Sequence, residues 1–213
     1  MRDLKAYRRG GVVLIAALGL LTAASAQATP LLTPTLTTPD ISGLFVSVDY
    51  DASGDPGVLT VTGGFNWELD DGATTESIVG GSLSLSATVN KTTGALLSGS
   101  FTLSGTIAGL GTGLGPILTG TMTALGFPDN GAQGNVLEFD FNVTGGDASS
   151  LYGPTGYMAI SSPGFALSWS SDFSEPFGGP VDIQKPVPEP SNALLALTGL
   201  LGLVARRKLA GRH

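Results

Sequence analysis

Four oxygen-bearing side chains stand at alternate positions in residues 49–55 (DYDASGD). In this spacing Asp49, Asp51, Ser53 and Asp55 could converge on one Ca²⁺, while the glycine between the last two allows the bend. The twelfth position of an EF-hand loop would be Thr60 and not Glu, and no flanking helix is expected. The other interpretation is a hairpin turn, because Asp, Ser, Gly and Pro favour turns.

Adjacent acids and scattered aromatic residues are the remaining candidates for chemistry. Asp70 and Asp71 would point to opposite faces of a strand, which makes them a poor acid–base pair. Glycosidase chemistry needs two carboxyl groups about 5–10 Å apart across a cleft, and spacing along the chain does not reveal such a pair. Two Trp and two Tyr residues could stack on sugar rings or pack in a core: Trp67, Tyr152, Tyr157 and Trp169.

The composition excludes several kinds of active site. The chain has no cysteine, so thiolate nucleophiles, thiolate metal sites and disulfides are absent. Its one histidine is His213, so neither a Ser-His-Asp triad nor a multi-histidine zinc site can be built within the chain. The glycines form no phosphate-binding loop of the G-x-x-x-x-G-K-[ST] type. We expect a protein that is not an enzyme.

The elements that would position these residues are β-strands. The 213 residues include 32 Gly, and only 13% are charged, which is typical of strands joined by turns. Period-two alternation predicts strands at 44–50, 58–62, 83–89, 95–107, 117–125, 136–143, 156–160 and 165–170. Half-polar alternation indicates antiparallel sheets with one face in water. The predicted fold is all-β, an antiparallel β-sandwich or a curled β-roll.

Two of these segments make the sidedness explicit. In 83–89, the apolar positions alternate with small polar residues and should share one face: Leu83, Leu85, Ala87 and Val89. In 136–143, the apolar Leu137, Phe139, Phe141 and Val143 should face one way, with Glu138, Asp140 and Asn142 facing the other.

Basic residues lie almost entirely at the two ends of the chain. Between Thr29 and Pro186 only Lys91 and Lys185 are basic, against 11 Asp and 4 Glu. A body of this charge repels polyanions, so nucleic acid and anionic lipid are not expected partners. The acidity also keeps an exported domain soluble.

The N-terminus has the pattern of a signal peptide. Residues 1–10 are basic, residues 11–21 (GVVLIAALGLL) are apolar, and small residues follow. The Ala-x-Ala form of Ala26-Gln27-Ala28 predicts cleavage after Ala28, with cleavage after Ala26 as the alternative. An uncleaved anchor is the other interpretation, but the apolar run is short for a membrane span.

The C-terminus carries a second apolar segment. Residues 191–205 (SNALLALTGLLGLVA) have no charge and no polar stripe, and Arg206, Arg207 and Lys208 follow at once. Basic residues stay on the cytoplasmic side, so this predicted transmembrane helix would run from outside to inside. Pro186, Pro188 and Pro190 keep the chain before it out of a helix.

Val187-Pro188-Glu189-Pro190, the apolar run and the basic cluster together resemble the sorting signal of the PEP-CTERM family. Segments such as GGSLSLSATVN, LLSGSFTLSGTI, LTGTMTALGF and FNVTGGD also resemble the bodies of PEP-CTERM proteins. The resemblance implies export across the inner membrane of a Gram-negative bacterium, anchoring through the C-terminal helix, and processing near Glu189 by an exosortase-type membrane protease. It also implies a link to exopolysaccharide and biofilm. Apart from the Ca²⁺ considered above, we expect no cofactor.

The expected organisation follows from these parts. It comprises a signal peptide (1–28), a Pro/Thr-rich linker (29–40), an all-β exported domain (41–180), a linker with the Pro-Glu-Pro motif (181–190), a transmembrane helix (191–205) and a basic cytoplasmic tail (206–213). The expected function is a surface or extracellular-matrix protein found in the cell envelope or outside the cell. A carbohydrate-binding or adhesive module is the first alternative, and an Asp/Glu-based exported hydrolase is the second.

Overall fold

The computed structural model describes Leu32 and residues 34–110, 113–127, 136–163 and 168–187. The predicted signal peptide with Ala26 and Ala28, the Pro188-Glu189-Pro190 motif, the helix at 191–205 and the basic cluster Arg206, Arg207 and Lys208 lie outside this part of the chain. Among the described residues, no helix has the length and apolar character needed to cross a membrane.

Strands account for most of the described chain. They are β1 (Leu36–Asp51), β2 (Gly57–Asp70), β3 (Thr75–Val89), β4 (Leu96–Ile107), β5 (Gly115–Gly126), β6 (Val136–Gly145), β7 (Thr155–Ser161), β8 (Phe173–Glu175) and β9 (Val181–Pro186). Two single turns of helix accompany them, a 3₁₀ turn at Ala108–Leu110 and α2 at Ser149–Tyr152.

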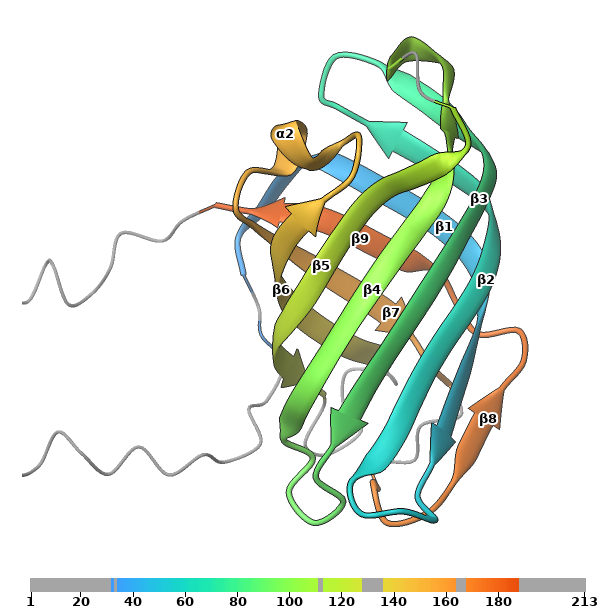
Figure 1. Ribbon diagram of the computed structural model, residues 1–213, viewed down its shortest axis with the longest axis vertical. Coiled ribbons are helices and arrows are strands. Elements are labelled where there is room, and N and C mark those ends of the chain that lie inside the picture. Colours follow the sequence, from blue (N-terminus) through green and yellow to red (C-terminus); the bar gives the residue numbers. More distant parts are fainter. Residues whose placement is uncertain (1–31, 33, 111–112, 128–135, 164–167, 188–213) are drawn as a thin grey trace, which may run out of the picture.

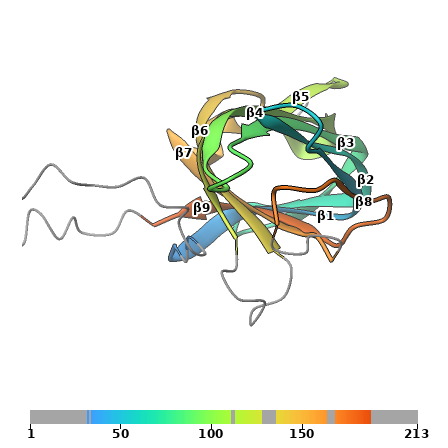
Figure 2. The same ribbon diagram turned by 90° about the horizontal axis from the view of Figure 1, so that it is seen from below.

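Eight of the strands form a closed antiparallel barrel (Figures 1 and 2). From β2 to β7 each strand pairs with the next, β9 pairs with β7 and with the first half of β1, and the β1–β2 pairing closes the ring. The short strand β8 pairs with the second half of β1, through Val48–Glu175 to Tyr50–Phe173. A closed barrel leaves no unpaired sheet edge between its strands, which removes the main aggregation hazard of an all-β chain.

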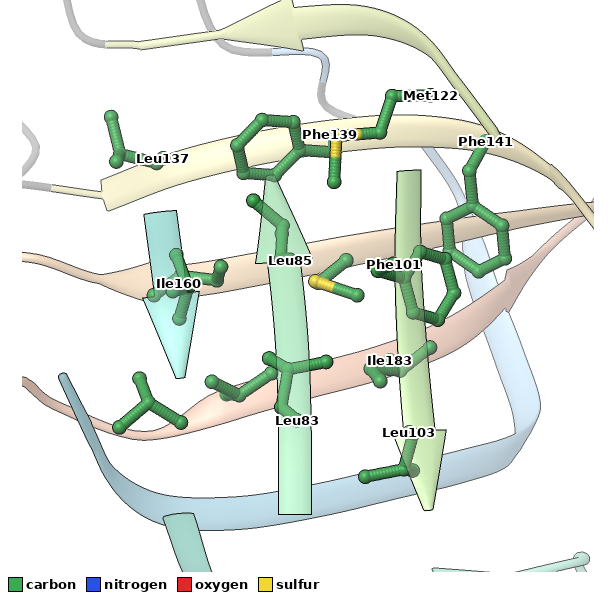
Figure 3. Close-up of a cluster of buried hydrophobic side chains, with 14 of the residues drawn as sticks. Leu83, Leu85, Phe101, Leu103, Met122, Leu137, Phe139, Phe141, Ile160 and Ile183 are labelled. Carbon is green, nitrogen blue, oxygen red and sulfur yellow. The ribbon is translucent and has the colours of Figure 1, made fainter. Parts of the chain in front are cut away.

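The barrel interior is filled by side chains, as Figure 3 shows for one part of it. The alternating faces predicted from the sequence are confirmed in β3, where Leu83, Leu85, Ala87 and Val89 are all buried. In β6, Leu137, Phe139 and Phe141 are buried, and Val143 packs against them. Phe101 of β4 meets Phe141 edge to face, with ring centroids 4.7 Å apart. The core therefore comes from every side of the ring and does not form one slab between two sheets.

A row of β-bulges crosses the barrel wall at one level. The register shifts between Ser42 and Leu44 in the β1–β2 pairing, between Gly63 and Trp67 in β2–β3, and between Val79 and Ser82 in β3–β4. Bulges and strand glycines bend sheets sharply, and barrels use them at corners. The sequence signal for this bend is the pair of glycines inside each of two strands, 63–64 in β2 and 80–81 in β3.

Three sequence-based expectations are corrected. The all-β class is confirmed, but the architecture is a closed barrel and not a sandwich or an open roll. Both predicted linkers contain part of a β-strand: β1 begins at Leu36, within 29–40, and β9 occupies Val181–Pro186, within 181–190. No strand forms at Ser168, Trp169 and Ser170, at the end of the segment predicted at 165–170, and the short strand there is instead Phe173–Glu175.

Two positions depart from what simple alternation would give. Leu44 precedes the buried Val46 and Val48 at the same spacing, but the bulge interrupts the alternation and leaves it 39% exposed. Glu138 lies on the outer wall, the face predicted for it, yet it is only 8% exposed. One of its oxygens accepts a 2.5 Å hydrogen bond from the backbone N–H of Leu32, a residue that precedes β1.

Candidate binding groove

The row of bulges creates a groove in the outer wall of the barrel. The groove has a volume of about 580 Å³. Its lining comes from β1, β2 and β3 and mixes polar and apolar groups: Ser42, Gly43, Leu44, Asn66, Trp67, Glu68, Ser77, Ile78 and Gly80. Gly43 and Gly80 in this lining have no side chain to fill the space, so the bend in the barrel wall also leaves a hollow in its surface.

Trp67 forms the base of this region. The indole is 1% exposed and is cradled by Gly43, Gly64 and Gly81. A Cβ built on Gly81 would stand 2.5 Å from Cδ1 of the indole, and one on Gly64 would stand 2.6 Å from Cζ2, so neither site accepts a side chain without movement. The indole N–H is buried and has no hydrogen-bond partner within the described part of the chain. An unpaired buried donor of this kind is uncommon and calls for an explanation.

Two exposed phenylalanines lie next to residues that line the groove. Phe45 and Phe65 are 46% and 51% exposed, and their rings stack with centroids 4.8 Å apart and planes at 18°. Their neighbours Leu44 and Asn66 line the groove, and Leu44 pairs with Phe65 across β1 and β2. The two rings therefore lie next to residues that line the groove, and we call this stacked pair the aromatic platform.

Backbone strain is concentrated at the same place. In the described chain, the non-glycine residues with positive φ are Phe45 at 59° and Asn66 at 52°. This left-handed region is unfavourable for a bulky residue such as Phe. Glycine would adopt it at no steric cost, as Gly63 and Gly64 do nearby. Strain of this kind gathers at functional sites more often than elsewhere.

The predicted calcium loop spans the end of β1, which holds Asp49 and Asp51, and the turn to β2, which holds Ser53 and Asp55. Asp49 accepts hydrogen bonds from the hydroxyls of Ser47 at 3.1 Å and Ser174 at 2.5 Å. Asp51 accepts one from the backbone N–H of Ser53, and hydrogen bonds from Ser53 lower the pKa of this carboxyl. Asp55 is exposed in the same turn. The bond from Ser53 to Asp51 is that of a turn, whereas Asp49 accepts from side chains of β1 and β8.

The same turn opens onto a second groove of about 650 Å³. Asp49 and Asp51 line it together with Asp172, Phe173 and Ser174. No group of three or more acidic or histidine side chains is placed to hold a metal ion within the described residues. The structure therefore does not gather Asp49, Asp51, Ser53 and Asp55 into a ligand set, and calcium binding there stays a sequence-based prediction.

The adjacent pair Asp70 and Asp71 also shapes a turn. Asp71 accepts backbone hydrogen bonds from Ala73 and Thr74, which lower its pKa, and Asp70 accepts one from Gly72. A carboxylate whose charged form is stabilised in this way can accept the hydrogen bonds of a turn, but it is a poor proton donor.

Carboxyl groups with raised pKa lie elsewhere, on the outer wall. Burial raises the pKa of Asp40, Asp140 and Asp182, and a neighbouring acid adds to the effect at Asp40 and Asp140. They belong to β1, β6 and β9, where Asp140, Tyr157, Gln184 and Asp40 follow one another across neighbouring strands. Sequence reasoning did not single them out, because their proximity exists only in the closed barrel.

The four aromatics proposed as sugar-stacking residues are all buried: Trp67, Tyr152, Tyr157 and Trp169. Tyr152 donates a 2.7 Å hydrogen bond from its hydroxyl to the carbonyl oxygen of Ile183. Trp169 packs edge to face on Tyr50, with centroids 5.1 Å apart. Packing is therefore the correct reading for these residues, and the exposed aromatic side chains of the groove region are Phe45 and Phe65, which the sequence analysis missed.

Comparisons with known proteins find no relative. No family model, no curated protein and no solved structure matches the chain.

Proposed function

We propose that this chain is an exported, non-enzymatic surface or matrix protein of the cell envelope, sorted through the signal at residues 187–213. One observation carries the proposal: the two ends of the barrel meet. The backbone N–H of Val187 donates a hydrogen bond to Thr35 at 2.8 Å, and Leu36 pairs with Pro186. The chain therefore enters and leaves the fold at one place, where β1 begins and β9 ends (Figure 1).

The position of the barrel between the predicted processing sites supports this proposal. Cleavage after Ala28 falls before Leu36, and cleavage near Glu189 falls after Pro186, so both cuts would leave every strand intact. Glu189 follows Val187 by two residues, a reach of about 7 Å in an extended chain. A membrane protease would therefore cut close to the end of β9, at a motif whose two prolines disfavour helix.

Intact-mass analysis in a host with an exosortase tests the proposal. The mature protein should lack residues 1–28 and 191–213. Replacing Pro188-Glu189-Pro190 by three alanines should leave an uncut form in the inner membrane, and neutral residues at Arg206, Arg207 and Lys208 should weaken retention before processing. Pro34→Ala is the matched control, since it removes a proline before the barrel without touching the motif. Normal cutting of the alanine variant would show that the tripeptide is not recognised.

A second candidate function is a carbohydrate-binding or adhesive module delivered by the same route. The stacked, exposed Phe45 and Phe65 beside a groove with polar lining favour it. An Asp/Glu-based hydrolase finds less support. The described carboxyl groups with raised pKa do not line this groove; they are Asp40, Asp140 and Asp182.

A further inference from the structure

The region of the bulges carries more exposed aromatic surface than the barrel needs. Phe45 and Phe65 point large apolar rings into water, although alternation within a strand could have placed them inside. Stacking on each other covers one face of each ring at most. The outer face of each ring remains as exposed aromatic surface, next to Leu44 and Asn66 of the groove lining.

The strained backbone also presents side chains that the bend itself does not require. The chain places glycine at 63, 64 and 80, where positive φ is needed for the bulges. At the same level it places Phe45 and Asn66 in that conformation, at an energetic cost. Contacts of Phe45 and Asn66 with a ligand would offset this cost, which is larger for Phe than for Asn.

The polar lining restricts what that ligand can be. Ser42, Asn66 and Ser77 offer hydroxyl and amide groups, and Glu68 adds a carboxylate. The described residues that line the groove include no basic side chain, and the carboxylate of Glu68 disfavours an anionic ligand. A purely apolar ligand would strip water from these polar groups without replacing their hydrogen bonds. The matching ligand is uncharged, rich in hydroxyl groups, and has apolar C–H faces for the rings.

We infer that the groove and its phenylalanine platform bind a neutral polysaccharide chain. One sugar ring lays its C–H face on the Phe45–Phe65 platform. The neighbouring sugar occupies the groove, where its hydroxyls donate to Glu68 and exchange hydrogen bonds with the amide of Asn66. This inference rests on the second candidate function above and names its ligand class. It does not depend on sorting through residues 187–213.

Binding is tested on the full chain in a zwitterionic detergent without sugar headgroups. The probes are three neutral hexa-oligosaccharides, made of β-1,4-glucose, β-1,3-glucose and β-1,4-mannose, with hexa-mannuronate as the anionic comparison. We expect at least one neutral probe to shift the NMR signals of the Phe45, Asn66 and Trp67 amides and of the Trp67 indole N–H, with saturation. The mannuronate probe should leave them unchanged.

The variants separate the site from the fold. Phe65→Ala should weaken binding at least tenfold and leave the circular dichroism spectrum unchanged, because the ring is half exposed. Glu68→Gln should weaken it several-fold. Leu97→Ala is the matched control, since Leu97 is 57% exposed on β4 and does not line the groove, and it should bind like the natural protein.

Four results would overturn the inference. The first is no binding of any neutral probe. The second is equal binding of mannuronate. The third is binding that Phe65→Ala does not weaken. The fourth is concentration-dependent dimerisation in analytical ultracentrifugation that Phe65→Ala abolishes, since a second copy of the chain would then be the occupant of the platform. Each of these leaves the sorting proposal standing, because mass analysis tests that proposal separately.

Discussion

The backbone N–H of Val187 and the carbonyl oxygen of Thr35 lie 2.8 Å apart and form a hydrogen bond that joins the two ends of the barrel. This bond extends the β1–β9 ladder beyond the pair Leu36–Pro186. β9 is the last strand in the described part of the chain, and it completes the ring between β7 and the first half of β1.

The first prediction concerns this closure. A chain of residues 32–187 should unfold cooperatively, whereas a chain of residues 32–180 should not, because it lacks β9 with the fully buried Val181 and Ile183. Without β9, β7 and the first half of β1 become unpaired edges prone to aggregation. Thermal melts followed by circular dichroism, with size-exclusion chromatography, make the comparison. Equal melting temperatures for the two chains would contradict the prediction.

The second prediction concerns the glycine cradle of Trp67. Gly81→Ala should destabilise the protein by about 1–3 kcal/mol, because the added Cβ overlaps the indole. In a Trp67→Leu background the same change should cost at least about 0.5 kcal/mol less, since the two sites are in contact. Urea unfolding measures all four proteins.

Gly113→Ala is the matched control for this cycle. A Cβ on Gly113 has no neighbour within 4 Å, so the change should stay within about 0.5 kcal/mol. If the costs of Gly81→Ala and Trp67→Leu simply add, the indole does not lie against Gly81 in solution.

The third prediction is a pH dependence on the acidic side. Burial raises the folded-state pKa of Asp182, so the folded protein holds this proton more tightly than the unfolded chain does. The stabilisation is complete below the unfolded pKa of about 3.9 and is lost as pH rises through the higher folded value. Asp182→Asn should therefore increase the free energy of unfolding at pH 7, by less than about 1 kcal/mol, and flatten its pH dependence.

The control for Asp182→Asn is Asp55→Asn, which removes the same charge from the exposed turn between β1 and β2. Urea unfolding between pH 3.5 and 7.5 compares the three proteins, and the ionic strength is the same at every pH. An equal gain from both substitutions would assign the effect to net charge and not to burial at Asp182.

The fourth prediction concerns Tyr152 in the single turn α2. Its fully buried hydroxyl donates to the carbonyl oxygen of Ile183 in β9, so Tyr152→Phe should cost about 0.5–1.5 kcal/mol. Burial and the charge of Asp40 raise the pKa of this phenol. Its stabilisation is therefore present below about pH 10 and lost as pH rises further. The variant should lose less stability than the natural protein above pH 10 in urea unfolding.

The same experiment distinguishes the hydrogen bond from packing. Tyr152→Leu should cost more than Tyr152→Phe at every pH, because it also removes ring volume from a filled core. An unchanged stability of Tyr152→Phe at neutral pH would show that the hydroxyl contributes nothing.

The sequence by itself determined the all-β class and the sidedness of the regular strands. Leu83, Leu85, Ala87 and Val89 are inside because a strand that alternates apolar and polar residues can bury only one face. Local patterning of this kind needs no knowledge of the rest of the chain. The absence of cysteine and of any histidine but His213 likewise excluded whole classes of active site.

The tertiary structure decided how the sheet closes and where a site could form. Period-two alternation is the same in a sandwich and in a barrel, so it could not reveal that β1 pairs with β2 on one edge and with β9 on the other. The groove depends on bulges in three adjacent strands reaching one level, and Phe45 meets Phe65 only because Leu44 and Phe65 share a register. Such meetings are set by long-range pairing, which the sequence of a single strand does not encode.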